Sequence, residues 1–195
     1  MVEDSAVFVA MRPDRPGPFF QLLVRLQMIG SVVMMGVAGC GKSTVGAVVA
    51  QAERLQLVEG DDHHSAASRD KMSRGIPLTD ADRVGWLATL AGELAARPQG
   101  IVLTCSALRR AYREQLRAAS PALRFVFLDL TRDQALARVT ARASSHFFSA
   151  TLVDSQFETL ESPVGEPLVL RVDATAPLAE LQTRISAWLH ATETP

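Results

Sequence analysis

This sequence has few cysteines, almost no net charge and no long apolar run. Its 195 residues include two cysteines, Cys40 and Cys105, which excludes a framework of disulfide bridges and predicts a reducing compartment, the cytoplasm. The 20 Lys and Arg residues nearly balance the 21 Asp and Glu residues, and a formal net charge of -1 indicates neither a nucleic-acid partner nor a membrane surface. An anionic substrate must therefore be bound by basic side chains that the fold brings together locally.

The most apolar stretch covers residues 19–35, but polar and charged residues interrupt it and it is short for a membrane span. Acidic residues at positions 3 and 4 fit neither the positive start of a secretion signal nor an acid-poor transit peptide. A cleaved or membrane-bound segment is therefore the weaker alternative. We expect residues 1–27 to be a poorly ordered leader and residues 28–195 to form one domain with a full apolar core.

Short apolar runs alternate with helical patterns along the rest of the chain, which is typical of βαβ units and a parallel sheet. The runs are apolar on both faces and partly β-branched or aromatic, as strands covered by helices on both sides must be. Five such runs occur, at Ser31–Met35, Leu55–Glu59, Ile101–Cys105, Phe125–Leu130 and Leu168–Val172. The sequence therefore predicts a three-layer α/β domain with a five-stranded parallel sheet flanked by helices.

Capping residues mark several of the helices between these runs. Thr79 can cap a helix with Asp82 at its third position, and Thr131 can do the same with Gln134. Gly75 is placed to end the helix before Thr79. The first of the capped helices should bury an apolar stripe made of Val84, Leu87, Ala91 and Leu94. A C-terminal helix should contribute core residues at helical spacing, namely Leu181, Ile185, Trp188 and Leu189.

One segment carries a phosphate-binding motif. The pattern G-x-x-x-x-G-K-[ST] is matched at every fixed position by Gly36-Val37-Ala38-Gly39-Cys40-Gly41-Lys42-Ser43-Thr44. A predicted strand comes directly before it and a helical pattern directly after it, which is the context that the motif requires. In such a loop the backbone N–H groups and the helix N-terminus bind phosphate oxygens. We expect Lys42 to reach the β- and γ-phosphates of ATP or GTP and the Ser43 hydroxyl to bind Mg²⁺.

Cys40 lies inside this loop, where two interpretations compete. The positive end of a helix dipole favours a thiolate, so a reactive cysteine of low pKa is one alternative. The other is a small side chain that fits a tight loop and does no chemistry. The second interpretation is favoured.

The second predicted strand ends in a cluster of carboxylates and imidazoles, Glu59-Gly60-Asp61-Asp62-His63-His64. A transition-metal site is one interpretation, but adjacent side chains of an extended segment point to opposite faces and rarely bind the same ion. The end of a strand beside the phosphate loop opens onto the binding crevice of a parallel sheet. A carboxylate at this end can accept a proton from the acceptor hydroxyl or hold the water shell of Mg²⁺. We assign this role to Asp61.

Five segments resemble the gluconokinase family in sequence, order and spacing. They are GVAGCGKST, EGDDHH, KMSRGIPLTDADRVGWL, CSALRRAYREQLR and HFFSATLVDSQFETLE, and the similarity runs from about Val32 to the C-terminus. Many phosphate-loop proteins share the first segment, whereas the later four segments are much more specific to the gluconokinase family. The resemblance implies an adenylate-kinase-like P-loop fold, ATP and Mg²⁺ as cosubstrates, phosphorylation of the 6-hydroxyl of gluconate, and a homodimer.

Cationic side chains are expected to converge on such a site, because gluconate carries a carboxylate and the transferred phosphoryl group carries further negative charge. Lys71 and Arg74 follow the second predicted strand, and Arg109 and Arg113 follow the third. The last two are four residues apart, a spacing that places both on one face of a helix. We expect all four to bind the substrate.

Arg138 and Arg142 repeat this spacing on the helix after the fourth strand. The pair resembles the arginines that open the lid of adenylate-kinase-like enzymes, and we expect a short lid here at about residues 138–150. The resemblance implies that Arg138 lies against the adenine and that Arg142 neutralises charge on the transferring phosphoryl group. The expected catalytic residues are therefore Lys42, Asp61 and Arg142.

Other residues are expected to contact the two substrates. His64 and His146 match motif positions of the family, which implies polar contacts with the substrate or the lid rather than proton abstraction. For His146 a purely structural role is an equal alternative. Ser106 follows the third strand and can offer its hydroxyl or its N–H to the sugar acid. The segment Asp173–Pro177 should pass near the adenine ring, because it follows the fifth strand.

The sequence also departs from the family pattern. Ser65 and Ser68 stand where the family commonly has proline and asparagine, and Ala143–Ser145 replaces a lid segment that usually carries a basic residue and a glycine. No acidic residue closes the third strand, an absence that the resemblance to the family implies, and Asp61 becomes the more important carboxylate. Two alternatives stay open. One is another small-molecule kinase of this fold, acting on shikimate, adenylylsulfate or a nucleoside monophosphate, and the other is a nucleotide-binding regulatory protein without catalysis.

Overall fold

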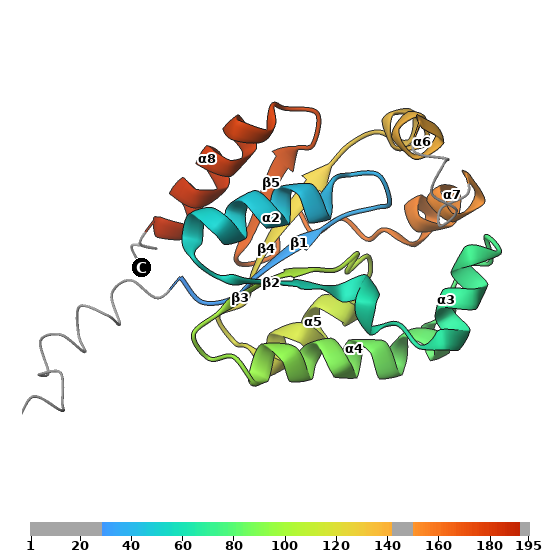
Figure 1. Ribbon diagram of the computed structural model, residues 1–195, viewed down its shortest axis with the longest axis horizontal. Helices are drawn as coiled ribbons and strands as arrows, with labels where there is room; N and C mark the ends of the chain where they lie inside the picture. Colours follow the sequence, from blue (N-terminus) through green and yellow to red (C-terminus); the bar gives the residue numbers. More distant parts are fainter. Residues whose placement is uncertain (1–28, 142–149, 192–195) are drawn as a thin grey trace, which may run out of the picture.

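A five-stranded parallel sheet forms the middle layer of the protein in a computed structural model that describes residues 29–141 and 150–191 (Figure 1). Its strands stand in the order β2-β3-β1-β4-β5, and every neighbouring pair is parallel. The strands are β1 (Val32–Met35), β2 (Gln56–Glu59), β3 (Ile101–Thr104), β4 (Arg124–Asp129) and β5 (Val169–Asp173). Each strand begins and ends within one residue of the predicted run, so the predicted α/β fold is confirmed.

Helices cover both faces of this sheet. Helices α2 and α8 pack together on one face, and α4 and α5 pack together on the other (Figure 1). Helices α3, α6 and α7 lie at the end of the sheet where the loop between β1 and α2 emerges. The bounds are α2 (Lys42–Glu53), α3 (Ala66–Ser73), α4 (Asp80–Ala95), α5 (Arg110–Ala119), α6 (Arg132–Ala141), α7 (Ala150–Thr159) and α8 (Leu178–His190), with a 3-10 turn η1 (Gly60–His63) between β2 and α3.

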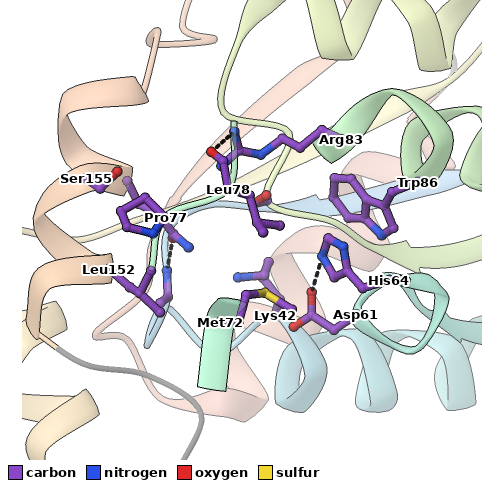
Figure 2. Close-up of a pocket in the computed structure, with 13 residues that line it drawn as sticks. Lys42, Asp61, His64, Met72, Pro77, Leu78, Arg83, Trp86, Leu152 and Ser155 are labelled. Atoms are coloured by element: carbon purple, nitrogen blue, oxygen red, sulfur yellow. Dashed lines mark hydrogen bonds and ion pairs between the residues drawn. The ribbon is translucent and has the colours of Figure 1, made fainter. Parts of the chain in front are cut away.

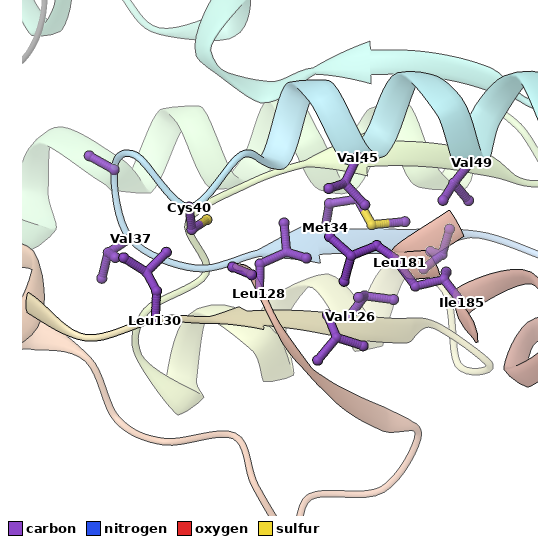
Figure 3. Packing of buried hydrophobic residues seen from close by; sticks show 14 of the residues in the cluster. Met34, Val37, Cys40, Val45, Val49, Val126, Leu128, Leu130, Leu181 and Ile185 are labelled. Atoms are coloured by element: carbon purple, nitrogen blue, oxygen red, sulfur yellow. The ribbon is translucent and has the colours of Figure 1, made fainter. Parts of the chain in front are cut away.

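Alternation along the central strands divides the core into two apolar clusters. In β1, Val32 and Met34 face α2 and α8, whereas Val33 and Met35 face α4 and α5. All four side chains are fully buried, because helices cover both faces of the sheet. Figure 3 shows the first cluster, in which residues of α2 and α8 pack over β1 and β4. This packing fixes the carboxyl end of β1, from which the phosphate loop starts.

The predicted caps are present at the helix ends. Thr79 caps α4, since its hydroxyl accepts from the N–H of Asp82 and the Asp82 carboxylate accepts from the N–H of Thr79. The same reciprocal pair of bonds joins Thr131 and Gln134 at the start of α6. Gly75, with a φ of 70°, directly follows the end of α3. These local predictions are confirmed.

The predicted apolar stripe of α4 is wrong at one position. Val84 is 63% exposed, while the buried residues of this helix are Trp86, Leu87, Leu90 and Leu94. The buried face is centred on the turn that carries Trp86, which leaves Val84 on the solvent side. In α8 the prediction is confirmed for the three buried residues Leu181, Ile185 and Leu189, and Trp188 packs against the same cluster.

Two predictions fall outside the residues that the structure describes. The leader over residues 1–27 is one of them, and the start of the domain at residue 28 stays a prediction with it. The expected lid at residues 138–150 is the other, because residues 142–149 are not described. Within the described ranges, no helix combines the length and the apolar character needed to cross a membrane.

Candidate active site

The phosphate loop joins β1 to α2 through two glycines that no other residue can replace without strain. Gly36 has a φ of 139°, and a Cβ atom there would lie 2.8 Å from the carbonyl oxygen of Leu128. Gly41 has a φ of 96° and precedes α2, whose first turn is not capped by a side chain. The N–H groups of this turn are therefore directed at the loop, as in helix N-termini that bind phosphate.

Lys42 turns back over this loop. Its Nζ donates to the carbonyl oxygens of Gly36 and Val37, at 3.1 and 3.2 Å. The ammonium group is thus held against the backbone of the loop, and this is the position predicted for a lysine that neutralises phosphate charge.

A carboxylate from the neighbouring strand lies beside Ser43. The Ser43 hydroxyl donates to Glu59 Oε2 at 3.0 Å, and the hydroxyl of Thr104 donates to the same oxygen at 2.6 Å. Thr104 ends β3, a strand that no acidic residue closes, and the acidic group next to Ser43 comes from β2 instead. Hydroxyl and carboxylate oxygens are the ligands that Mg²⁺ prefers, and the donor set therefore fits this ion. Sequence reasoning missed Glu59, because its contacts come from residues 16 and 45 positions away.

Gly60 holds the turn that presents Asp61. Its N–H donates to Thr104 Oγ1 at 3.2 Å and its carbonyl oxygen accepts from Trp86 Nε1 at 2.7 Å. A Cβ atom on this residue would lie 2.2 Å from the carbonyl oxygen of Thr104, so the backbone approaches β3 more closely than any other residue type allows. The start of η1 is thereby fixed to both β3 and α4, and Asp61 is positioned as the next residue.

His64 is buried behind Asp61. Its ring stacks on Trp86 with 4.4 Å between the ring centres and 13° between the planes, and its Nε2 lies 3.8 Å from Asp61 Oδ1. Burial lowers the pKa of His64 below its ordinary value, although the nearby Asp61 carboxylate acts in the opposite direction, so the imidazole is neutral at pH values near 7. Among the described residues, its Nδ1 atom has no hydrogen-bond partner.

These residues share one pocket with the phosphate loop. Lys42, Asp61 and His64 line it together with Arg83 and Trp86 of α4 (Figure 2). The other lining residues come from the phosphate loop, from α3 and the segment after it, from the loop after β3 and from α7, namely Ala38, Met72, Pro77, Leu78, Ser106, Leu152, Ser155 and Gln156. The pocket therefore brings together five of the site residues predicted from the sequence, Ala38, Lys42, Asp61, His64 and Ser106.

Arg83 is the cation of this pocket that the sequence did not reveal. Its side chain is 14% exposed, and Nη1 donates to the carbonyl oxygen of Leu78 at 2.7 Å and lies 3.9 Å from a carboxylate oxygen of Asp80. Among the described residues, Leu78 is the one acceptor of a hydrogen bond from this guanidinium. A usable signal was present, because Arg83 and Trp86 are three residues apart on a predicted helix and so share a face.

A second hollow lies on the other side of the phosphate loop. It is lined by Cys40, Gly41 and Thr44 of the motif, and by Arg138 and residues that follow β5. Arg138 donates to the carbonyl oxygen of Ala174 at 2.8 Å and to that of Gly39 at 3.4 Å. The loop thus separates two hollows, one lined by the candidate acceptor residues and the other by the residues expected near the adenine.

Comparison with known proteins identifies the family. The model of the AAA domain matches residues 32–167. The thermosensitive gluconokinase of Escherichia coli strain K12 is 39% identical over 155 residues, which cover 77% of this chain and 82% of that protein. The chain belongs to the gluconokinase family. The gluconokinase of Gluconobacter oxydans is 44% identical over 144 residues, 72% of this chain and 80% of that protein.

A solved structure agrees with this assignment. The crystal structure of a gluconokinase from Sinorhizobium meliloti 1021 is similar at a TM-score of 0.77 and 44% identity, covering 83% of this chain and 92% of that one. Membership of the gluconokinase family makes the protein a P-loop kinase of α/β fold. The pocket described above is therefore the candidate site of phosphoryl transfer.

None of the four cations predicted from the sequence as substrate ligands lines this pocket, and three of them pair with aspartates. Lys71 donates to Asp82 at 2.7 Å, and this hydrogen bond lowers the pKa of Asp82 to about 2. Two other pairs are formed at the surface, Arg74 with Asp70 at 2.6 Å and Arg109 with Asp80 at 3.1 Å. Each predicted ligand is thus bound to a neighbouring carboxylate in this structure.

Arg113 is placed differently from the prediction. Arg109 precedes α5 in extended backbone and is partly exposed, whereas Arg113 is 0% exposed, so the two do not share a helix face. Arg113 donates to the carbonyl oxygens of Ala107 and Leu108 and forms an ion pair with Glu166. Burial raises the pKa of Glu166, but hydrogen bonds from Arg113 and Arg117 outweigh this effect and hold the pKa below its ordinary value. This geometry fits a structural role that fixes the loop after β3.

Of the departures from the family pattern, the structure describes those at Ser65 and Ser68 but not the one at Ala143–Ser145. Ser65 caps α3, because its hydroxyl oxygen accepts from the N–H of Ser68 at 3.0 Å, so the two serines keep a defined start for this helix. Arg142, His146 and Ala143–Ser145 lie outside the described residues. Within the described ranges, no group of three or more His, Cys, Asp and Glu side chains could hold a metal ion.

Both cysteines are expected to be unreactive in the native protein. Cys40 and Cys105 are each 1% exposed, and burial raises the pKa of both thiols, that of Cys105 to about 12. A low-pKa thiol at Cys40 is therefore contradicted. An aromatic disulfide reagent at about pH 8 should label neither cysteine rapidly in the native state and both in denaturant, because the thiolate is the reactive form. Labelling of one thiol in the native protein at the rate of a free cysteine would restore the reactive interpretation.

Proposed function

We propose that the protein transfers the γ-phosphoryl group of ATP to the 6-hydroxyl of D-gluconate. The observation that carries this proposal is that Lys42 of the phosphate loop and Asp61 line the same pocket (Figure 2). A phosphate-binding cation and a candidate proton acceptor thus face one space, which a phosphoryl transfer requires. The names of the gluconokinase relatives supply the acceptor.

The acceptor would be bound by the pocket wall opposite the phosphate loop. Asp61 has a side chain that is 61% exposed to the pocket and its surroundings, so it can accept the proton of a sugar hydroxyl. Arg83 supplies the cation that a sugar-acid carboxylate needs, and its fork of N–H donors suits a carboxylate. His64 and Ser106 offer further hydrogen bonds to hydroxyl groups. Bound gluconate would then have its carboxylate at Arg83 and its terminal hydroxyl at Asp61.

The nucleotide would be held by the loop and by the second hollow. Residues 36–44 bind the phosphates, Lys42 neutralises their charge, and Arg138 lies where it can contact the adenine. Ser43 and Glu59 would hold Mg²⁺, which neutralises phosphate charge when bound. Arg142, His146, and a lid at residues 138–150 remain parts of the proposal that rest on the family resemblance alone. So does the homodimer, whereas a cytoplasmic location rests on the low cysteine content.

The experiment that tests this function is ADP release by purified protein with Mg²⁺ and ATP. We expect D-gluconate to raise the rate by about 100-fold or more over ATP alone, because water is poorly positioned in a site built for a sugar acid. Shikimate and AMP are the comparison acceptors, since each presents a different shape to the same nucleotide site. Phosphorylation at the 6-hydroxyl is checked by the product's NMR spectrum.

Each other outcome contradicts the proposal in a definite way. Stimulation by shikimate or AMP, and not by gluconate, would assign another acceptor to the same fold. ATP binding without release of ADP in the presence of any acceptor would indicate a nucleotide-binding protein that does no catalysis.

A further inference from the structure

Helix α7 forms one wall of the acceptor pocket. Leu152, Ser155 and Gln156 of this helix line the pocket together with Lys42 and Asp61. Figure 2 shows Leu152 and Ser155 on the helix that faces the phosphate loop. The function described above assigns no role to this wall.

Gln156 is bonded directly to the phosphate loop. Its Oε1 accepts from the backbone N–H of Ala38 at 2.6 Å, across 118 positions of sequence. Ala38 is 4% exposed, so this N–H needs a partner inside the protein or on a bound ligand. An N–H group can bond only to an acceptor, and this requirement fixes the orientation of the carboxamide, with its oxygen on Ala38.

The position of Ala38 within the loop indicates which phosphate of a bound nucleotide would lie nearest to Gln156. Ala38 lines the acceptor pocket, whereas Cys40, Gly41 and Thr44 line the hollow on the nucleotide side. Phosphoryl transfer runs from the nucleotide towards the acceptor, so the group that moves must pass the loop at its acceptor side. Lys42, whose Nζ donates to Gly36 and Val37, lies at the same turn of the loop.

From this placement we propose that Gln156 contacts the γ-phosphoryl group of ATP, to which its carboxamide N–H groups donate. The carboxamide can bond to the loop both without and with a bound nucleotide, because it carries an acceptor for the Ala38 N–H and two donors for phosphoryl oxygens. Through this contact, α7 would bind the γ-phosphoryl group of the ATP that the phosphate loop holds. Since α7 also carries Leu152 and Ser155, this contact would link the γ-phosphate to the wall against which the acceptor binds.

The proposal predicts that substitution of Gln156 weakens the binding of ATP but not of ADP. Gln156→Glu keeps the shape and the acceptor for Ala38, but replaces the donors by a negative charge that repels the phosphoryl group. We expect affinity for a non-hydrolysable ATP analogue to fall by about 10-fold or more, since a bond to a charged group is lost, while ADP affinity changes by less than about 2-fold. Titration calorimetry with Mg²⁺ measures both affinities without turnover.

A second variant and a control separate this effect from general damage. Gln156→Met has a similar length and no charge, and it should also weaken the ATP analogue selectively, by a smaller factor. Gln115→Glu places the same added charge at an exposed site of α5 and should bind both nucleotides as the wild type does. Thermal unfolding of each variant confirms that it is folded.

Two results would overturn the proposal. Unchanged affinity for the ATP analogue in both Gln156 variants would show that the side chain does not meet the γ-phosphate. Equal losses for ADP and for the analogue would show that Gln156 only shapes the loop. The inference rests on the proposed kinase function for the identity of the nucleotide, but binding is measured without gluconate. Failure of the gluconate assay would therefore leave this test intact.

Discussion

Replacement of Asp61 by asparagine is expected to lower kcat by about 100- to 10,000-fold, the range that loss of a general base produces. The amide keeps the size of the carboxylate but cannot accept the proton of the acceptor hydroxyl. Gly60, bonded to Thr104 and Trp86, fixes the backbone of this turn, so the substitution should not move it. Steady-state rates of ADP release with saturating gluconate measure the effect.

Affinity for ATP should stay within about 3-fold of the wild-type value in this variant, because the loop that binds the phosphates is untouched. Asp62→Asn is the matched control, since Asp62 is the adjacent exposed residue of η1 and does not line the pocket. It should turn over at a rate close to that of the wild type. Turnover of Asp61→Asn near the wild-type rate would remove Asp61 from the mechanism.

The parts of the molecule that the sequence predicted well are those in which the deciding residues are neighbours in the chain. The phosphate loop is one contiguous motif, and the caps at Thr79 and Thr131 each involve a partner three residues away. The strands coincide, within one residue at each end, with short and mostly apolar runs of the sequence. In each case the physical reason acts within a single turn or strand, so a local pattern suffices.

The residues that were missed or misplaced are determined by contacts between distant segments. Arg113 was expected at the substrate because it is charged, but Glu166, 53 positions later, supplies the carboxylate that allows its burial. Glu59 acquires its place from Ser43 and Thr104, and Gln156 from Ala38. No spacing in the sequence indicates these pairs, because the sheet order brings them together only in the folded protein.

Basic residues were a poor guide to the pocket, because their partners in the folded protein decide whether they are available. Lys71, Arg74 and Arg109 match the expectation of clustered cations, yet each is bonded to an aspartate of its own neighbourhood. A cation that is already paired must break that pair before it binds a substrate. Arg83 differs in degree, because its hydrogen bond goes to the neutral carbonyl oxygen of Leu78 and the Asp80 carboxylate lies farther away, at 3.9 Å.

Replacement of Arg83 by methionine is therefore expected to lower kcat/KM for gluconate by about 100-fold or more, the usual consequence of removing one partner of a desolvated charge pair. Most of the loss should lie in KM, because a carboxylate remote from the reacting hydroxyl is bound alike in the ground state and the transition state. Affinity for ATP should not change. Initial rates over a range of gluconate concentrations at saturating ATP separate KM from kcat.

Comparison of three variants makes this test decisive. Arg110→Met removes an exposed arginine that pairs with Glu114 on α5, and it should leave KM for gluconate unchanged. Arg74→Met tests the other candidate for the cation that binds the substrate carboxylate. The sequence predicted Arg74 as a substrate ligand, whereas the structure pairs it with Asp70 away from the pocket. A rise in KM for Arg74→Met with an unchanged value for Arg83→Met would place the substrate carboxylate at α3. The opposite result would place it at α4, where Arg83 faces Asp61 and Lys42 across one pocket.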